Sequence, residues 1–206
     1  MIKLKQVYKH FKNQPKNIFE NLNLELKPNF IYVLRGVNGS GKTTLLKLIS
    51  KLLSINSGSI QMPESYKISY VSSNERSFFG RMTGYQNLDF FSKLDDQTNI
   101  KLDQFLTDYD HAFKFSEFLE RKFIHMSSGQ KKRMAIARAF SKQSNILLLD
   151  EPFNFLDEHS RKALAMLIEN YVDDGKYVIL ATNSDEFNSK NFVKNIIIKD
   201  RKIEYN

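Results

Sequence analysis

The residues that could do chemistry begin with a glycine-rich run, Gly36–Thr44, which matches the phosphate-binding pattern G-x-x-x-x-G-K-[ST]. Glycines in such a loop let consecutive backbone N–H groups turn inward toward the oxygens of a triphosphate. A helix that begins behind the loop adds the partial positive charge of its N-terminus. We expect Lys42 to reach the β- and γ-phosphates and the Thr43 hydroxyl to ligate Mg²⁺. The nucleotide-binding groups predicted here belong to Gly36, Asn38, Gly39, Ser40, Gly41, Lys42, Thr43 and Thr44.

Two adjacent acids, Asp150 and Glu151, follow the apolar run 146–149. An apolar strand that delivers an aspartate at its carboxyl end is the Walker B arrangement, in which Asp150 would hold Mg²⁺ directly or through water. Glu151 comes one residue later, where it can polarise the water that attacks the γ-phosphate. The apolar run before the pair argues against an ordinary acidic surface.

A third candidate is the stretch Met126–Gln130, which reads Met-Ser-Ser-Gly-Gln and precedes a run rich in Lys and Arg. Ser127 and Ser128 could cap a helix whose N-terminus presents N–H groups to an anion. The same Ser-Ser-Gly sequence is also an ordinary helix cap, so both interpretations stay open from these residues alone. The apolar positions that would form the buried face of this helix are Ala135, Ile136 and Ala139.

Strands and helices must position these motifs. Apolar or alternating runs predict strands at 3–8, 22–26, 31–34, 59–62, 67–71, 145–150, 177–181, 195–199 and 202–205, with a turn at 13–17. Helices are expected behind the glycine loop to about Leu53, at 85–94 and at 158–172, with a mainly helical stretch at 101–123. The aromatic residues of this last stretch are expected to be core, although they could line a groove for a partner helix.

Composition narrows the class of protein. The chain has 206 residues, no cysteine and a formal net charge of +8. No disulfide framework or thiolate metal site is therefore possible, and the sequence shows neither a signal core nor an apolar run long enough to span a membrane. The lysines are scattered along the chain, which favours a solvated basic surface. We therefore expect no nucleic-acid partner.

Together the three motifs resemble the nucleotide-binding domain of ABC-type ATPases, over essentially the whole chain. The stretch Met126–Gln130 is similar to that family's signature Leu-Ser-Gly-Gly-Gln, with Ser128 in place of a glycine. The resemblance implies ATP and Mg²⁺ as cofactors and a head-to-tail dimer, expected to be a homodimer. Each ATP would lie between one P-loop and the partner's signature. The signature residues implied to contact that nucleotide are Ser127, Gly129 and Gln130.

The resemblance assigns other positions and exposes two departures. Phe11 falls where the family has an aromatic residue that stacks on adenine, and Asp157 falls in the D-loop, which reaches across the dimer interface. Where the family has a glutamine that contacts Mg²⁺, this chain has Ser72–Glu75; Ser73 aligns by position, and Asn74 or Glu75 could substitute. Asn183 replaces a histidine that hydrogen-bonds the γ-phosphate. Since an amide cannot become a cation, we predict slow hydrolysis until a partner is present.

The fold implied is α/β: a P-loop NTPase with a RecA-like core around a mostly parallel sheet. An antiparallel β lobe from the first strands and the hairpin, and a helical lobe near residues 84–140, would complete it. We expect residues 1–206 to form a single nucleotide-binding domain.

The function implied is that of an ATP-hydrolysing subunit, catalytic through Glu151, Lys42 and Asn183, that energises a membrane transporter of the exporter kind. Its partner would be a separate transmembrane permease, which places the chain in the cytoplasm, peripheral on the cytoplasmic face of a membrane. The stretch 75–88 lies where a permease would dock, with Phe78, Phe79 and Met82 offering apolar contacts, unless this loop packs on its own helical lobe. The alternatives are a soluble ATPase acting on ribosomes or DNA, and a nucleotide-binding switch with little hydrolysis.

Overall fold

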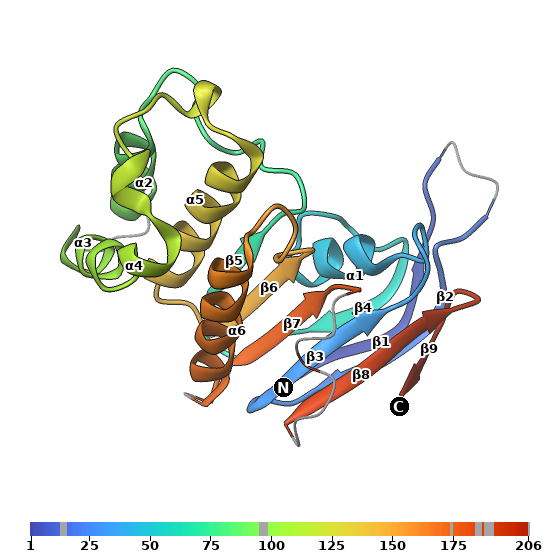
Figure 1. The fold of residues 1–206 in the computed structure, drawn as a ribbon. Coiled ribbons are helices and arrows are strands. Elements are labelled where there is room, and N and C mark those ends of the chain that lie inside the picture. The colour runs from blue at the N-terminus through green and yellow to red at the C-terminus, as the bar shows by residue number, and fades with distance from the viewer. Residues whose placement is uncertain (13–15, 95–98, 174, 184–186, 188–191, 206) are drawn as a thin grey trace.

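A computed structural model of the chain describes residues 1–12, 16–94, 99–173, 175–183, 187 and 192–205. Its centre is a six-stranded sheet in the order β5-β6-β7-β3-β8-β9 (Figure 1). Neighbouring strands from β5 to β8 are parallel, and β9 pairs antiparallel with β8. The strands of this sheet are β3 (Phe30–Arg35), β5 (Ile68–Val71), β6 (Ile146–Asp150), β7 (Tyr177–Ala181), β8 (Val193–Lys199) and β9 (Lys202–Tyr205).

The central strands β6 and β7 are buried at every residue, because both faces of the sheet are covered. Alternate side chains along β6 enter two different hydrophobic cores. Leu147 and Leu149 join the core formed with the helical lobe and α6 (Glu158–Asp173). Ile146 and Leu148 join the core formed with α1 (Lys42–Ile49) and the second sheet.

The second sheet is antiparallel, in the order β2-β1-β4, and corresponds to the predicted β lobe. Its strands are β1 (Ile2–Lys9), β2 (Phe19–Leu26) and β4 (Ser57–Gln61). The assignment of the C-terminal hairpin to this lobe was wrong: β8 pairs in parallel with β3, so the hairpin extends the main sheet. Helix α1 ends at Ile49, short of the expected Leu53, and Lys51 just beyond it has a left-handed φ of 60°.

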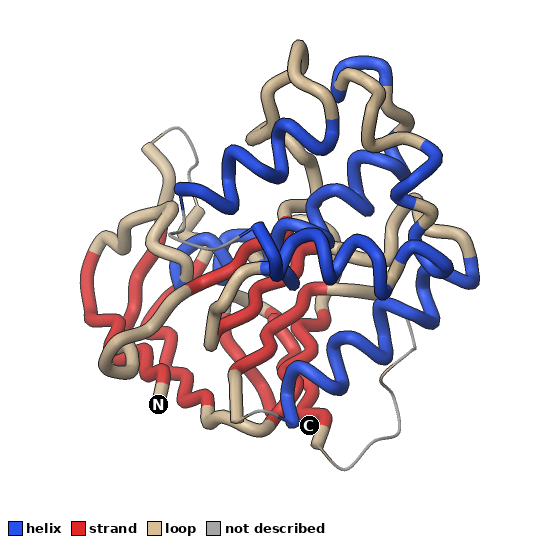
Figure 2. Tube along the Cα trace, turned by 90° about the vertical axis from the view of Figure 1, so that its left-hand side faces the viewer, coloured by secondary structure: helices blue, strands red, loops and turns tan. Residues whose placement is uncertain are grey.

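The helical lobe projects from the sheets as a separate group of helices (Figures 1 and 2). Its helices are α2 (Gly84–Leu94), α3 (Asn99–Asp108), α4 (Asp110–Phe113), the 3₁₀ turns η1 (Phe115–Glu117) and η2 (Phe123–His125), and α5 (Ser128–Ser141). The stretch 101–123 is thus mainly helical but broken, since Lys114 adopts a left-handed φ of 50° that ends α4. Phe113, Phe115 and Phe118 are at most 1% exposed, which confirms them as core.

Candidate active site

The predicted motifs meet where the parallel strands end. The glycine loop follows β3, Ser72 and Ser73 follow β5, Asp150 ends β6, and Asn183 follows β7. Parallel strands bring their carboxyl ends to one edge, where ligands bind in open α/β sheets. A cavity of about 240 Å³ lies at this edge, and we call it the phosphate cavity after the motif that contributes most of its lining. Its lining residues are Asn38, Gly39, Gly41, Lys42, Thr43, Thr44, Ser73, Asp150 and Glu151.

The glycine loop is held closely against its surroundings. Gly36 has φ 149°, and a Cβ there would lie 2.6 Å from the carbonyl oxygen of Ile198. Gly41 has φ 111°, and a Cβ there would lie 2.9 Å from the ring of Phe19. These positions therefore need glycine both for backbone conformation and for space. The Lys42 ammonium lies 2.6 Å from the Gly36 carbonyl oxygen, which keeps the lysine curled over the loop.

Thr43 and Asp150 form a contact across 107 residues of sequence. The Thr43 hydroxyl oxygen lies 2.9 Å from Oδ1 and 3.0 Å from Oδ2 of Asp150, whose residue is 1% exposed. A hydroxyl and a carboxylate on one wall, with the Ser73 hydroxyl in the same cavity, form an oxygen donor set of the kind that suits Mg²⁺.

Glu151 is held in an unusual backbone conformation, with a left-handed φ of 47°. Its N–H donates to the Ala181 carbonyl oxygen at 2.8 Å, and its carboxylate accepts a hydrogen bond from the backbone N–H of Asn183. Burial raises the pKa of the Glu151 carboxyl, against the opposing effect of the Lys42 ammonium. A carboxylate with a raised pKa, on a residue with an unusual backbone conformation beside Lys42, is suited to act as a general base. Asn183 itself is exposed and lies next to this carboxylate.

Three residues could have replaced the expected glutamine, and the structure separates them. Ser73 lines the 240 Å³ cavity, whereas Asn74 and Glu75 line a different cavity of about 570 Å³ bounded by α1, β5, α5 and the loop 72–78. A tight turn causes the separation: the Ser72 hydroxyl donates to the Asn74 carbonyl oxygen at 3.0 Å and accepts from the Asn74 N–H at 3.2 Å.

The signature residues build a capped helix. The Ser127 side chain accepts from the N–H of Gln130 at 3.2 Å, and the Gln130 side chain accepts from the N–H of Ser127 at 3.0 Å. This capping box starts α5 and employs the Gln130 amide within its own chain. A Cβ on Gly129 would lie 2.7 Å from the carbonyl oxygen of Phe155, so this position requires glycine. None of these signature residues lines the phosphate cavity described above.

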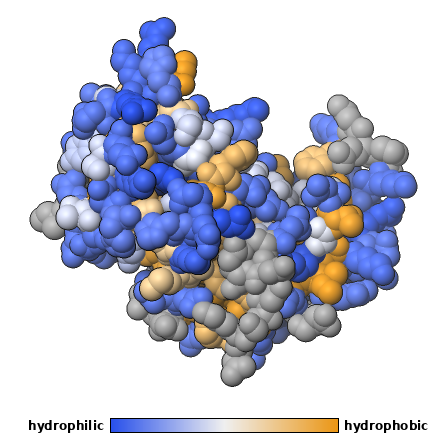
Figure 3. Space-filling view, viewed as in Figure 1, coloured by the Kyte–Doolittle hydropathy of each residue, from blue (hydrophilic) through white to orange (hydrophobic). Residues whose placement is uncertain are grey.

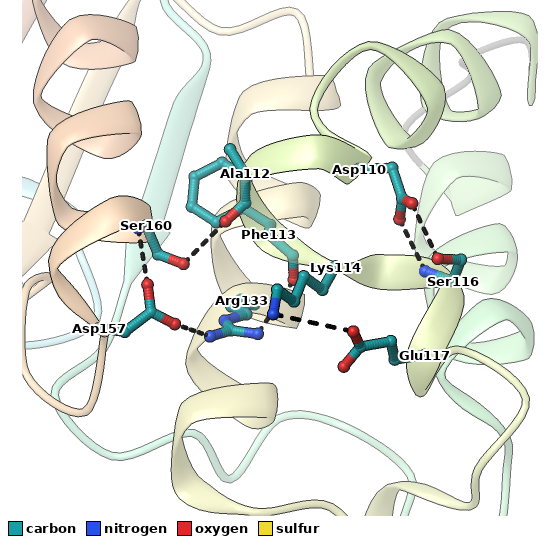
Figure 4. Close-up of polar contacts among 9 residues, drawn as sticks. All are labelled: Asp110, Ala112, Phe113, Lys114, Ser116, Glu117, Arg133, Asp157 and Ser160. Atoms are coloured by element: carbon teal, nitrogen blue, oxygen red, sulfur yellow. Dashed lines mark hydrogen bonds and ion pairs between the residues drawn. The ribbon is translucent and has the colours of Figure 1, made fainter.

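A polar network joins α5 to α6 and α4 (Figure 4). The Arg133 guanidinium forms an ion pair with Asp157 and also donates to the Phe113 carbonyl oxygen at 3.2 Å. Asp157 accepts from the Ser160 N–H at 2.8 Å, and the Ser160 hydroxyl donates to the Ala112 carbonyl oxygen at 2.9 Å. Both Asp157 oxygens thus contact groups of their own chain, although the resemblance implied that this residue reaches across an interface. Sequence reasoning missed Arg133, because a basic run after a helix start is typical of a solvated face.

Phe11 follows β1 and is half-buried, with the Lys9 ammonium 4.9 Å from its ring centroid. It does not line the phosphate cavity, and part of the turn predicted after it, residues 13–15, lies outside the described residues. A larger cavity of about 750 Å³ lies beside the glycine loop and is lined in part by Ile18, Ser40 and Arg201. The role of Phe11 as an adenine-stacking residue stays a prediction.

Comparisons with known proteins agree on one family. A family model described as "ABC transporter" matches residues 19–154. The "Cytochrome c biogenesis ATP-binding export protein CcmA" of Vibrio vulnificus (strain YJ016) is 32% identical over 181 residues, covering 82% of this chain and 86% of that protein. The solved structure "Dimeric Structure of MJ0796, a Bacterial ABC Transporter Cassette" is 25% identical with a TM-score of 0.83, covering 99% of this chain and 97% of that one.

A second state of that cassette, "Dimeric structure of a post-hydrolysis state of the ATP-binding cassette MJ0796 bound to ADP and Pi", is 25% identical with a TM-score of 0.81. It covers 99% of this chain and 97% of that one. In the part of the present chain that the structure describes, no helix has the length and apolarity needed to cross a membrane.

Proposed function

The chain belongs to the ABC transporter family as an ATP-hydrolysing subunit that energises transport, and we propose that it works as an identical pair docked on a separate transmembrane permease. Residues 1–206 act as a single nucleotide-binding domain in this proposal. The observation that carries it is the 240 Å³ cavity, in which Lys42, the Thr43–Asp150 contact and Glu151 converge. We further propose the export direction, because the relative from Vibrio vulnificus is named an export protein.

Hydrolysis is assigned to residues of this cavity. The N-terminus of α1 and Lys42 bind the phosphates, and Lys42 moves from the Gly36 carbonyl to the ligand. Thr43 and Asp150, with Ser73 facing them, would hold Mg²⁺, which supplies neutralisation of the phosphate charge. Glu151 orients and deprotonates the attacking water, with its carboxylate held by the Asn183 N–H.

A head-to-tail pair explains where the signature lies. Ser127 and Ser128 are exposed at the N-terminus of a fourteen-residue helix, and the chain's own phosphate cavity does not include them. The free first-turn N–H groups of α5 can therefore bind the γ-phosphate on a second copy. The dimeric cassette MJ0796, which matches 99% of this chain, supports the same arrangement.

The permease would dock on the loop between β5 and α2. Phe79 on this loop is 47% exposed, and its ring packs edge-on against Phe90 with centroids 5.1 Å apart. Ile124 of η2, whose N–H donates to the Gly80 carbonyl oxygen of the loop, is 63% exposed. Arg76 and Arg81 are exposed on the same loop. On the face drawn in Figure 3 the surface is mainly hydrophilic, with apolar side chains in small separate patches. A small apolar patch with cations around it fits a transient protein interface.

Phe78 does not share this role, which corrects the prediction from sequence. It is 8% exposed, stacks on Phe123 with centroids 4.8 Å apart and lies edge-on to Phe91 at 5.7 Å. Phe78 therefore packs on its own helical lobe, as the alternative interpretation held, and Met82 is half-buried. Only Phe79 of the two neighbouring phenylalanines is available to a partner. On this proposal the subunit is peripheral on the cytoplasmic face of the membrane.

The experiment is a tagged pull-down from detergent-solubilised membranes, with co-purifying proteins identified by mass spectrometry. We expect one polytopic membrane protein in stoichiometric amount. Phe79→Asp should remove it, while Met166→Asp, which changes an apolar residue that is 65% exposed on α6, should not. Co-purification of ribosomes or nucleic acid with no membrane protein would contradict the proposal.

A further inference from the structure

Lys132 is buried in an unusual way for a lysine. It lies on α5, five residues after Ser127, and only 2% of it is exposed. Its ammonium nitrogen lies 2.7 Å from the Ser72 carbonyl oxygen and 4.0 Å from Oε1 of Glu75. A buried ammonium is costly unless it is hydrogen-bonded and paired, so these two contacts explain how α5 tolerates the charge at this position.

The first contact ties α5 to the residue that precedes Ser73. Ser73 lines the phosphate cavity together with Thr43 and Asp150, whereas Ser72 lines the cavity of about 570 Å³. The two hydrogen bonds between Ser72 and Asn74 make a tight turn around Ser73, so the position of the Ser72 carbonyl is coupled to that of Ser73. The carboxylates of Asp150 and Glu151 also act on the Lys132 charge through space. The ammonium therefore ties α5 to the loop that carries Ser73.

The second contact reaches the cavity bounded by α1, β5 and α5. The Glu75 side chain is 8% exposed, and its Oε1 is buried without a hydrogen-bond partner among the described residues. Burial raises the pKa of this carboxyl to about 7, with Lys132 and then Arg138 as the opposing cations. Glu75 lines that cavity together with Arg76 and Phe78, and all three belong to the proposed docking loop.

We propose that Lys132 is a positioning residue that holds Ser73 against the phosphate cavity by binding the Ser72 carbonyl from α5. The loop of this chain lacks the glutamine that the family has there. Lys132, on the signature helix, would instead fix the position of the loop. The proposal rests on the proposed role of Ser73 beside Mg²⁺. A merely structural lysine would affect the stability of the fold without affecting the dependence of hydrolysis on Mg²⁺.

The test is Lys132→Met in the purified full chain, which keeps an unbranched side chain as far as Cε and removes the ammonium. Single-turnover hydrolysis at saturating ATP should slow by about 10- to 100-fold, as expected for loss of a hydrogen bond from a charged donor. The Mg²⁺ concentration for half-maximal rate should rise, while ATP affinity without Mg²⁺ should change less than about twofold. Lys162→Met, which alters a lysine with 73% side-chain exposure, is the matched control and should change none of these.

A second variant protects the test against simple unfolding. Lys132→Met alone leaves the Glu75 carboxylate buried without its nearest cation, whereas the double variant Lys132→Met with Glu75→Gln removes both charges. We expect the double variant to keep a Tm near that of the unsubstituted chain and still to show slow hydrolysis and a raised Mg²⁺ concentration for half-maximal rate. Unsubstituted rate and Mg²⁺ dependence in this folded variant would overturn the proposal, as would a slow rate with unchanged Mg²⁺ dependence.

Ser73→Ala tests the premise separately. It should reproduce the shift in Mg²⁺ dependence without lowering the Tm. If Ser73→Ala has no effect, Lys132 does not act through Ser73 and the inference fails. Hydrolysis by the unsubstituted chain is measured in the same series. Its absence would count against the proposed function of the phosphate cavity, separately from the role of Lys132.

Discussion

Asn87 offers a quantitative test of how the docking loop is held. It lies on α2 with 0% exposure, and its side chain contacts the backbone of the loop before the helix. Its amide nitrogen lies 3.0 Å from the Phe79 carbonyl oxygen and 2.9 Å from the Thr83 carbonyl oxygen, and its Oδ1 accepts from the Phe79 N–H at 2.7 Å. Asn87→Ala removes these three hydrogen bonds and a fourth, longer one of 3.5 Å to the Met82 carbonyl oxygen.

The magnitude follows from which groups lose their partner. The Phe79 carbonyl still accepts from the Met82 N–H, and the Thr83 carbonyl still accepts from the Asn87 N–H. The Phe79 N–H loses the acceptor described above, at a cost of about 1–3 kcal/mol, and the other two bonds add about 1 kcal/mol each. We therefore expect Asn87→Ala to lower the free energy of unfolding by about 4 kcal/mol. At about 2–4 °C per kcal/mol for a chain of this size, the Tm should fall by about 8–16 °C.

The assay is urea unfolding with thermal melting, and Asn170→Ala on the exposed face of α6 is the control, expected to stay within about 0.5 kcal/mol. Asn87 does not line the phosphate cavity, so ATP affinity of the folded variant should be retained while permease co-purification is lost. A loss of stability below about 1 kcal/mol would refute the reasoning, since it would mean that water or a shifted loop replaces these bonds.

Three further predictions follow from the same geometry. Burial raises the pKa of the Glu75 carboxyl from 4.5 to about 7 in the folded state, so the free energy of unfolding should fall as pH rises from 4.5 to 7. Glu75→Gln should reduce this fall, as measured by urea unfolding at pH 5 and pH 7.5. Gly129→Ala should drive the signature helix away from the Phe155 carbonyl, costing about 1–3 kcal/mol in unfolding experiments. The purified chain should hydrolyse ATP slowly, and Asn183→His, beside Glu151, should raise that rate. A rate typical of the family, unchanged by this substitution, would contradict the last prediction.

Much of the candidate site could be predicted from sequence because its parts are local. The glycine loop places its N–H groups through the backbone conformation of neighbouring residues, so its function is visible in nine consecutive letters. Asp150 follows a wholly apolar run, which marks the end of a buried strand without knowledge of its neighbours. Parallel strands then bring such ends to one edge as a general rule, which is why Thr43 and Asp150 could be paired across 107 residues.

Other features were decided only by tertiary structure. Phe78 and Phe79 are adjacent and identical, yet one is 8% exposed and the other 47%. Phe78 packs on both Phe91 of α2 and Phe123 of η2, whereas Phe79 packs on Phe90 and Phe91 of α2. Lys132 belongs to a basic run that is typical of a solvated face, yet packing of α5 against the loop after β5 buries it. Burial depends on which distant surface is brought against a residue, and a local sequence pattern holds no information about that surface.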